Sequence, residues 1–173
     1  KVFACNGILF NHESPLRGEH FVTKKIIKSL VEIYLGEKKD SLKLGNIYSK
    51  RDWGHAEEYV NMMLKIITYK IADDFVISSG KQYTIKDFIN LTCKRLGIKI
   101  KWRGKGLNEK AIGEKGRKIV EISKRLFRPQ DVKYLLGDST KAKRKLKWKP
   151  KKNLNTLIDE MINFELGNFN ANN

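Results

Sequence analysis

The sequence predicts an α/β fold, with strands and helices alternating along the chain. Short runs that are almost entirely apolar, such as residues 2–10 and 74–78, are typical of strands covered on both faces in a parallel sheet. Other segments place apolar residues three and four positions apart, which is the pattern of a helix with one buried face. Because a predicted core strand opens the chain at Lys1, we expect the 173 residues to be the C-terminal part of a longer protein.

The first half of the chain is predicted to form three strands, with a helix after each of the first two. Gly36 is expected to end the first helix, because glycine readily adopts the left-handed conformation of a C-cap. In chain order these elements are a strand at 2–10, a helix at 21–36, a strand at 42–44, a helix at 56–69 whose buried face carries Tyr59, Met63, Ile66 and Ile67, and a strand at 74–78.

The second half begins with a helix whose start is marked by a capping box. Thr84 is the capping residue, and Asp87 stands where Glu or Gln is usual. The helix is expected to stop at Gly97, and the alternation over 98–103 predicts a half-buried edge strand. Then follow a glycine-rich surface loop at 104–118, a short helix from Pro129 to Leu136, a helix capped by Ser139 or Thr140, an amphipathic helix at 154–166 and a frayed tail at 168–173.

Basic residues are concentrated in one part of the chain. The net charge is +17, and residues 99–152 alone hold 20 Lys and Arg against 5 acidic residues. A solvated helix face followed by a basic connector is the favoured interpretation of the densest run, 141–152. A surface that clamps the nucleic-acid backbone is the alternative, and a field that attracts a diffusible polyanion such as a nucleotide is a third. Trp148 is expected to be a core anchor rather than a base-stacking residue.

The composition also excludes several classes of protein. No stretch approaches the roughly 18 apolar residues that a membrane helix requires, so no membrane partner is expected. Cys5 and Cys93 lie in apolar runs without a neighbouring His or Cys, which argues against a disulfide framework and a zinc finger and favours buried thiols in a reducing cytosol.

A dense polar cluster follows the first predicted strand, at residues 11–18. In doubly wound sheets, ligands bind beyond the carboxyl ends of the strands. Asn11 offers an amide donor, His12 a ring donor, and Arg17 a guanidinium that can grip phosphate through two hydrogen bonds. The alternative is an ordinary polar loop.

Three further places are candidates for nucleotide recognition. Arg128 and Asp131 flank Pro129, so that both can point the same way, with the guanidinium on phosphate and the carboxylate on sugar hydroxyls. A helix N-terminus stabilised by Asp131 is the alternative. Arg51 precedes Asp52 and a Trp, which also fits a structural ion pair under a ring. Lys25, on the first helix, would in isolation be interpreted as solvated. No complete catalytic set, metal-ligand spacing or phosphate-binding glycine loop occurs in this sequence.

These segments, taken in order, resemble the C-terminal half of the GDP-mannose 4,6-dehydratase family of extended short-chain dehydrogenases/reductases. The matching stretches are ACNGILFNHESPLRG at 4–18, FVTKKI at 21–26, LGN at 44–46, RDWGHA at 51–56, DFVI at 74–77, FRPQDV at 127–132, GDSTKAK at 137–143 and LKWKP at 146–150. The resemblance implies the last strands of a Rossmann-type parallel sheet plus a smaller α/β sugar-nucleotide-binding domain. Residues 1–18 would end the NADP-binding domain, and 19–173 would mostly bind substrate, with 45–80 returning in part to the first domain.

The resemblance also implies a reaction. Members of the family convert GDP-D-mannose into GDP-4-dehydro-6-deoxy-D-mannose and water, a lyase reaction at the start of GDP-fucose and GDP-deoxyhexose synthesis. A tightly held NADP takes a hydride from C4 of the hexose, water leaves across C5–C6, and the hydride returns to C6. A cytoplasmic homo-oligomer, dimeric or tetrameric, is expected.

Individual roles follow from the same resemblance. His12 and Arg17 match contacts to NADP, although Leu16 stands where the family usually has an Arg. The implied substrate contacts are Asn11 near the phosphates, Lys25 on the GDP side, Arg51 and Arg128 on the pyrophosphate, and Asp131, one methylene shorter than the usual Glu, on the ribose. The catalytic residues would lie upstream of residue 1, so the 173-residue chain alone is expected to be inactive. A related nucleotide-sugar epimerase and a basic nucleic-acid-binding module are the alternatives; the NHESP run at 11–15 argues against the epimerase.

Overall fold

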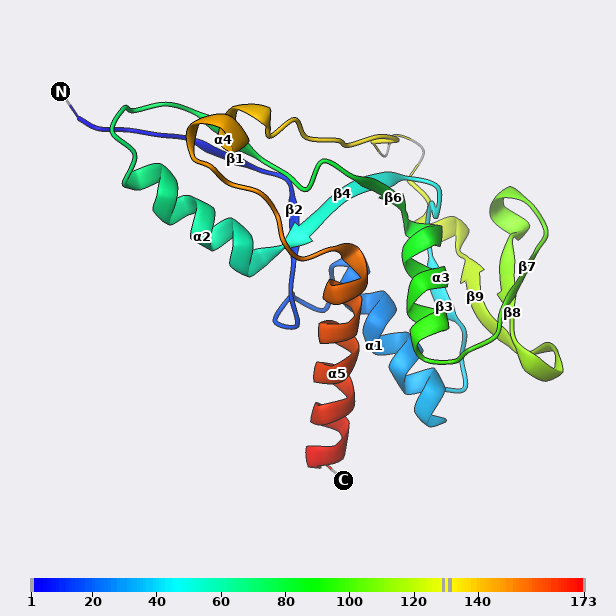
Figure 1. Cartoon of the computed structure of the whole chain (residues 1–173). Helices are drawn as coiled ribbons and strands as arrows, with labels where there is room; N and C mark the ends of the chain where they lie inside the picture. The colour runs from blue at the N-terminus through cyan, green and yellow to red at the C-terminus, as the bar shows by residue number, and fades with distance from the viewer. Residues whose placement is uncertain (1, 129, 131, 173) are drawn as a thin grey trace.

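The computed structural model describes residues 2–128, 130 and 132–172. Helices and short strands alternate along this part of the chain, which confirms the α/β class (Figure 1). The α-helices are α1 Val22–Leu35, α2 Ala56–Ile67, α3 Ile85–Arg95, α4 Thr140–Lys145 and α5 Leu154–Asn172. The strands are β1 Gly7–Leu9, β2 Asn11–Glu13, β3 Leu42–Leu44, β4 Lys50–His55, β5 Phe75–Ile77, β6 Gln82–Thr84, β7 Lys101–Arg103, β8 Lys110–Ile112 and β9 Lys118–Ile122. Three 3₁₀ turns are η1 Gly106–Asn108, η2 Glu114–Gly116 and η3 Lys124–Leu126.

The strands form three small sheets. β1 pairs in parallel with β5, and β2 pairs in parallel with β4, whose other neighbour, β6, is antiparallel. The third sheet has the order β3-β9-β8-β7, with β3 and β9 parallel and β7 at an edge, as the alternation over 98–103 predicts. The parallel pairs leave long crossover connections, and helices fill these connections.

Two hydrophobic cores hold these elements together. The larger one lies between α1, α3, α5 and the β3-β9 pair, with Ile26, Leu30, Phe88 and Ile158 completely buried. The smaller one joins α2 and β5 to the α4 segment, and there the Trp148 ring packs edge-on against Tyr59, with 6.4 Å between centroids. Trp148 is 6% exposed, so its expected role as a core anchor is confirmed. Figure 1 shows α2 and α4 on one side of the molecule and α1, α3 and α5 on the other.

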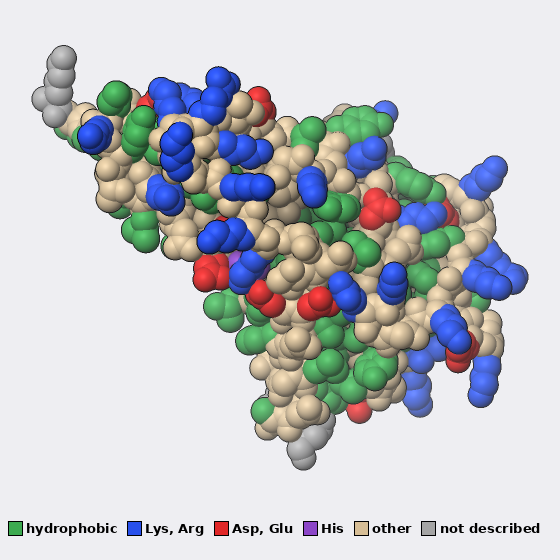
Figure 2. Space-filling model, in the orientation of Figure 1, with side chains coloured by type: hydrophobic (Ala, Val, Ile, Leu, Met, Phe, Trp, Pro, Cys, Tyr) green, Lys and Arg blue, Asp and Glu red, His purple; other side chains and the backbone are tan. Residues whose placement is uncertain are grey.

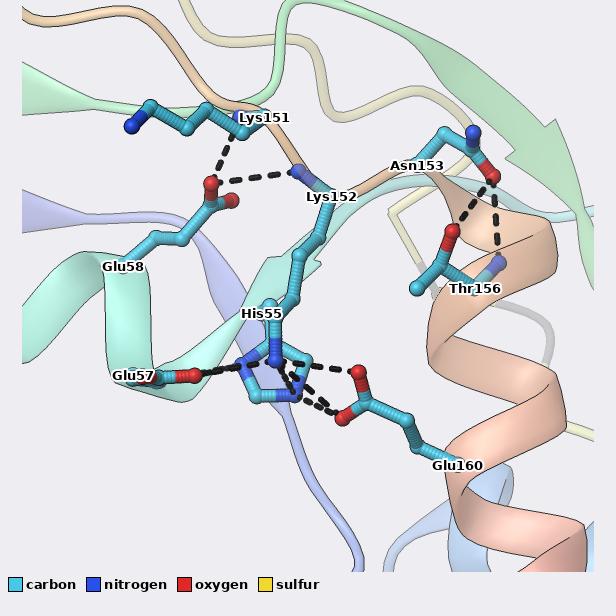
Figure 3. A network of polar contacts seen from close by, with 8 residues as sticks. All are labelled: His55, Glu57, Glu58, Lys151, Lys152, Asn153, Thr156 and Glu160. Carbon is cyan, nitrogen blue, oxygen red and sulfur yellow. Dashed lines mark hydrogen bonds and ion pairs between the residues drawn. The ribbon is translucent and has the colours of Figure 1, made fainter.

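A polar network connects the two sides (Figure 3). The ring of buried His55 accepts a hydrogen bond from the backbone N–H of Glu57, which caps α2, and its Nε2 lies 2.8 Å from Glu160 of α5. Lys152, on the connector before α5, bonds to both Glu57 and Glu160 at 2.9 Å. Glu58 accepts from the backbone N–H groups of residues 151 and 152. The connector is thus fixed to both helices.

Several local predictions are confirmed. Gly36 ends α1 in the left-handed conformation, with φ of 85°. Thr84 and Asp87 form both hydrogen bonds of the capping box at α3. The strands at 42–44 and 74–78 are present, although the second one is shorter.

The prediction of a strand at 2–10, buried on both faces, is wrong in the length of the strand and in its burial. It forms as β1 and β2, and residues 2–6 are not in a strand, because the partner strand β5 begins only at Phe75. Ile8 is 53% exposed, so β1 is not covered on both faces in this chain. On α2, Met62 rather than Met63 is buried beside Tyr59 and Ile66, and Ile67 is exposed. The side of the helix that carries Met62 is the one that faces β5.

Three predictions in the second half are also wrong. The stretch at 104–118 is not simply a loop, because it contains β8, which pairs with both β7 and β9 and buries Ala111. Residues 130 and 132–136 are not helical; there the chain runs beside β4, where the Lys50 N–H donates to Lys133 and its carbonyl accepts from Leu135. β2 pairs only with Trp53–His55 of β4, so the opposite side of Lys50 has no strand partner, and bonding its backbone groups outweighs the local helix signal. Residues 168–172, predicted as a frayed tail, continue α5.

No helix among the described residues is both long enough and apolar enough to cross a membrane.

Candidate functional site

A cleft of about 320 Å³ opens at the start of α1. Its walls come from α1, the turn after β3, the strand β4 and the segment after η3. The lining residues are His20, Val22, Lys25, Leu44, Gly45, Asn46, Arg51, Ile85, Leu126 and Arg128. The structure therefore brings together Lys25, Arg51 and Arg128, three of the predicted site residues, although they are far apart in the sequence.

Arg51 is half-buried on β4, and neighbouring backbone groups hold its guanidinium. One terminal nitrogen donates to the carbonyl of Lys50 at 2.9 Å and to that of Val132 at 2.5 Å. The second contact ties β4 to the segment that follows Arg128. Arg51 is therefore oriented before any ligand binds, which lowers the entropy cost of gripping an anion.

Lys25 lies in the first turns of α1 and is half-buried. Its ammonium donates to the carbonyl of Lys43 at 2.9 Å. Burial, and secondly the charge of Lys38, lower the pKa of Lys25 below its ordinary value. An anion in the cleft would relieve both effects, because a negative neighbour stabilises the ammonium form.

Gly45 decides how closely the Arg128 segment approaches the cleft. A Cβ at this position would lie 2.2 Å from the carbonyl oxygen of Leu126, which is far inside contact distance and involves backbone that cannot rotate away. The missing side chain lets Leu126 rest on the turn after β3. Arg128, two residues further on, is exposed and lines the cleft from that side.

The other predicted residues form a second group around β2. His12 lies opposite Gly54 of β4, and its Nδ1 donates to the carbonyl of Phe10 at 2.9 Å, which leaves Nε2 as an acceptor. Asn11 lies opposite Trp53, and its amide nitrogen is buried with no hydrogen-bond partner among the described residues. A buried donor without a partner is costly, so it marks a place where a ligand group would be stabilising.

Arg17 is held by its own surroundings. Its Nε lies 3.1 Å from Glu13, and its guanidinium stacks 3.4 Å from the centre of the Phe21 ring. Glu13 is 3% exposed and also accepts a hydrogen bond from Thr23 at 2.6 Å. Burial raises the pKa of Glu13, against the opposing effects of Thr23 and Arg17.

The two groups are adjacent, but they are not one site. Neither Asn11, His12 nor Arg17 lines the cleft. Arg17 is linked to the cleft through Phe21, whose ring lies under its guanidinium and 4.3 Å from the ring of His20 in the cleft wall. Asp131, the predicted ribose contact, lies outside the described residues.

Sequence reasoning missed several residues of the cleft. His20 and Asn46 supply polar groups, and Val22, Leu44, Ile85 and Leu126 form apolar walls. His20 had a usable signal, since it stands between the polar cluster at 11–18 and Lys25. The apolar residues had none, because their spacing is that of ordinary core positions.

The basic run lies away from the cleft. Figure 2 shows Lys and Arg side chains gathered in the upper part of the molecule, where α4 and the connector to α5 run. Lys141 and Lys145 pair with Asp73, and Lys152 belongs to the network in Figure 3. Hydrogen bonds from Lys141 and Lys145 hold the pKa of Asp73 down at about 2. Within the described residues, no group of His, Cys, Asp and Glu is arranged to hold a metal ion.

Comparison with solved structures identifies the fold. RMD from Pseudomonas aeruginosa, solved with NADPH, superposes with a TM-score of 0.78 at 14% identity, over 96% of this chain and 48% of that one. The UDP-glucose 4-epimerase of Thermotoga maritima gives 0.72 at 18% identity, over 95% and 46%. The fold is therefore the one shared by these two solved proteins, and it corresponds to about half of each.

Sequence comparison identifies the family. The family model described as GDP-mannose 4,6 dehydratase matches residues 1–161. GDP-mannose 4,6 dehydratase 2 of Caenorhabditis elegans is 45% identical over 94% of this chain, and the human GDP-mannose 4,6 dehydratase is 43% identical over 95%. The chain belongs to the GDP-mannose 4,6-dehydratase family. It spans 42% and 44% of the lengths of these two relatives.

Proposed function

We propose that this chain is the sugar-nucleotide-binding part of an enzyme that converts GDP-D-mannose into GDP-4-dehydro-6-deoxy-D-mannose and water. The observation that carries the proposal is the convergence of Lys25, Arg51 and Arg128 on one cleft. The family supports the substrate, since its curated relatives are named for this sugar nucleotide.

The chemistry of a diphosphate explains the three cations. A pyrophosphate leaving water needs permanently charged partners, and arginine supplies two parallel N–H donors for each phosphate. Arg51 takes this role from β4 and Arg128 from the segment after η3, and Lys25 adds a point charge on the GDP side. Asn11 donates its buried amide near the phosphates, and Asp131 accepts from the ribose hydroxyls. The apolar walls give the base a surface to pack on.

The residues of the second group fit a nicotinamide dinucleotide, and we assign NADP to them. His12 presents a ring edge and Arg17 a preoriented guanidinium. When bound, NADP would accept a hydride from C4 of the hexose and would return it to C6. The residues of this chain orient the hexose and the cofactor and exclude water around them.

The remaining chemistry is assigned to the part of the enzyme that the relatives have and this chain does not match. That part would carry the acid–base residues of the hydro-lyase reaction. The complete enzyme would act as a cytoplasmic homo-oligomer, a dimer or tetramer, at the start of GDP-fucose and GDP-deoxyhexose synthesis.

The purified 173-residue chain should bind GDP-mannose without converting it. Titration calorimetry with GDP-mannose, and product analysis after long incubation, measure the two properties. Titration with duplex DNA at low and raised salt is the control, since an affinity due to phosphate neutralisation falls steeply with salt. Salt-resistant DNA binding without GDP-mannose binding would contradict the proposal, and turnover by the chain would place the catalytic residues within it.

The titration of Lys25 should make nucleotide affinity depend on pH. The pKa of Lys25 lies below the ordinary value of 10.5. The ammonium is therefore present at lower pH, and its contribution to anion binding is lost as the pH rises through the lowered pKa. GDP affinity should therefore fall at a lower pH in the wild-type chain than in Lys25→Arg, which keeps its charge. Titration calorimetry of the wild-type chain and of Lys25→Arg with GDP, from neutral pH upwards, measures this difference. Identical pH profiles of the two proteins would show that Lys25 is not part of the site.

A further inference from the structure

Asp52 is a buried carboxylate next to the cleft residue Arg51. Its side chain is completely buried, with 0% exposure. Oδ1 accepts from the backbone N–H of Ser79 at 2.8 Å, and Oδ2 accepts from Gly80 at 2.9 Å and from Gly137 at 3.4 Å. Burying a charge is costly unless it is hydrogen-bonded, and these three donors provide the compensation.

The three donors belong to two segments that meet β4 from different directions. Ser79 and Gly80 form the turn between β5 and β6, whereas Gly137 ends the segment that runs beside β4. Successive residues of β4 bind this segment: Lys50 through its backbone, Arg51 through the carbonyl of Val132, and Asp52 through Gly137. Arg128 lies just ahead of the same segment.

The junction at Asp52 is tightly packed. A Cβ on Gly137 would lie 2.3 Å from the Cβ of Ser78, so the chain passes directly over that residue. Ser139, two positions on, donates to the carbonyl of Ser78 at 3.2 Å. A close-packed junction transmits a displacement instead of absorbing it.

We propose that Asp52 is a positioning residue for the diphosphate contacts: by fixing the far end of the 132–137 segment on β4, it sets the separation of Arg51 and Arg128 across the cleft. Side chains alternate along a strand, so Asp52 faces the interior while Arg51 faces the cleft. The inference rests on the proposed function only in that the two arginines grip a diphosphate; the anchoring itself can be tested without a ligand.

Asp52→Asn is the sharpest variant, because it keeps the size of the side chain. Its amide nitrogen can only donate, so one or two of the three backbone N–H groups lose their acceptor, depending on which oxygen the nitrogen replaces. Thr92→Val is the matched control: Thr92 is completely buried on α3, and its hydroxyl donates within that helix, to the carbonyl of Phe88 at 2.8 Å. Both variants remove a buried hydrogen bond, but only one touches the junction.

The ligand test compares GDP with guanosine, which lacks the phosphates, at a temperature where all variants are folded. Asp52→Asn should weaken GDP binding about tenfold or more, the size expected when a charge-assisted contact is misaligned, and should leave guanosine binding nearly unchanged. Thr92→Val should change neither affinity. An equal loss for both ligands, or no loss for either, would overturn the proposal.

A second measurement needs no ligand. The N–H of Leu135, two residues before Gly137 on the same segment, donates to the carbonyl of Lys50 and not to Asp52. If Asp52 positions the segment, hydrogen exchange at Leu135 should accelerate in Asp52→Asn; if its role is local, exchange should accelerate only at Ser79, Gly80 and Gly137. Should wild type fail to prefer GDP over guanosine, the proposed function falls, and the exchange at Leu135 alone decides the role of Asp52.

Discussion

Replacing Arg51 and Arg128 together by alanine should weaken GDP binding by several orders of magnitude. Hydrogen bonds to charged groups contribute about 1.5–3 kcal/mol each. Losing one such contribution at each of two residues corresponds to roughly 10²- to 10⁴-fold in the dissociation constant. Because both side chains line the same cleft and are proposed to grip the same group, we expect the effects of the single variants to be non-additive.

Two controls separate the grip on phosphate from simple loss of charge. Arg125→Ala removes an exposed cation from the neighbouring 3₁₀ turn without touching the cleft lining, and it should leave GDP affinity nearly unchanged. Replacing both cleft arginines by lysine keeps the charge but removes the paired N–H donors, so intermediate affinity is expected. Unchanged binding by the double alanine variant would show that the diphosphate lies elsewhere, and the central proposal would fail.

Replacing Trp148 by alanine should have the largest effect on stability. Its ring fills the smaller core against Tyr59, and removing a buried Trp costs about 3–5 kcal/mol through lost burial and the cavity left behind. Urea denaturation should show a lower midpoint with little change in slope.

Trp148→Phe and Trp102→Ala are the comparisons for this variant. The first keeps an aromatic ring and should recover much of the stability. The second removes a half-buried Trp from the edge strand β7, where the lost contacts are fewer, and should cost less. A stability loss at Trp148 no larger than that at Trp102 would mean that the smaller core contributes little to folding.

Helix boundaries were predictable where the signal is local. Thr84 and Asp87 mark the start of α3 through bonds made within four residues, and Gly36 ends α1 through its own backbone conformation. The strand β8 and the 132–137 segment were not predictable, because each is defined by a neighbour distant in sequence. Lys50 binds residues 133 and 135, and no pattern around those residues specifies that contact.

The site shows the same contrast between signals within a short stretch of sequence and contacts between distant residues. Arg51, Arg128 and Lys25 could be proposed from residue type and from family resemblance, and the structure places them around one cleft. Asp52 could not be recognised as an anchor, since beside Arg51 it fits an ion pair equally well. Its partners are backbone N–H groups, which leave no trace in side-chain composition.

The connector before α5 carries three lysines within four residues, at 149, 151 and 152, and is in sequence an obvious substrate for trypsin. A protease must draw several residues of backbone out into its own cleft, and here Glu58 and the Lys152 network hold that backbone in place. Digestion at this point therefore requires first separating α2 from α5. The two sides of the molecule should consequently survive limited proteolysis as a single piece.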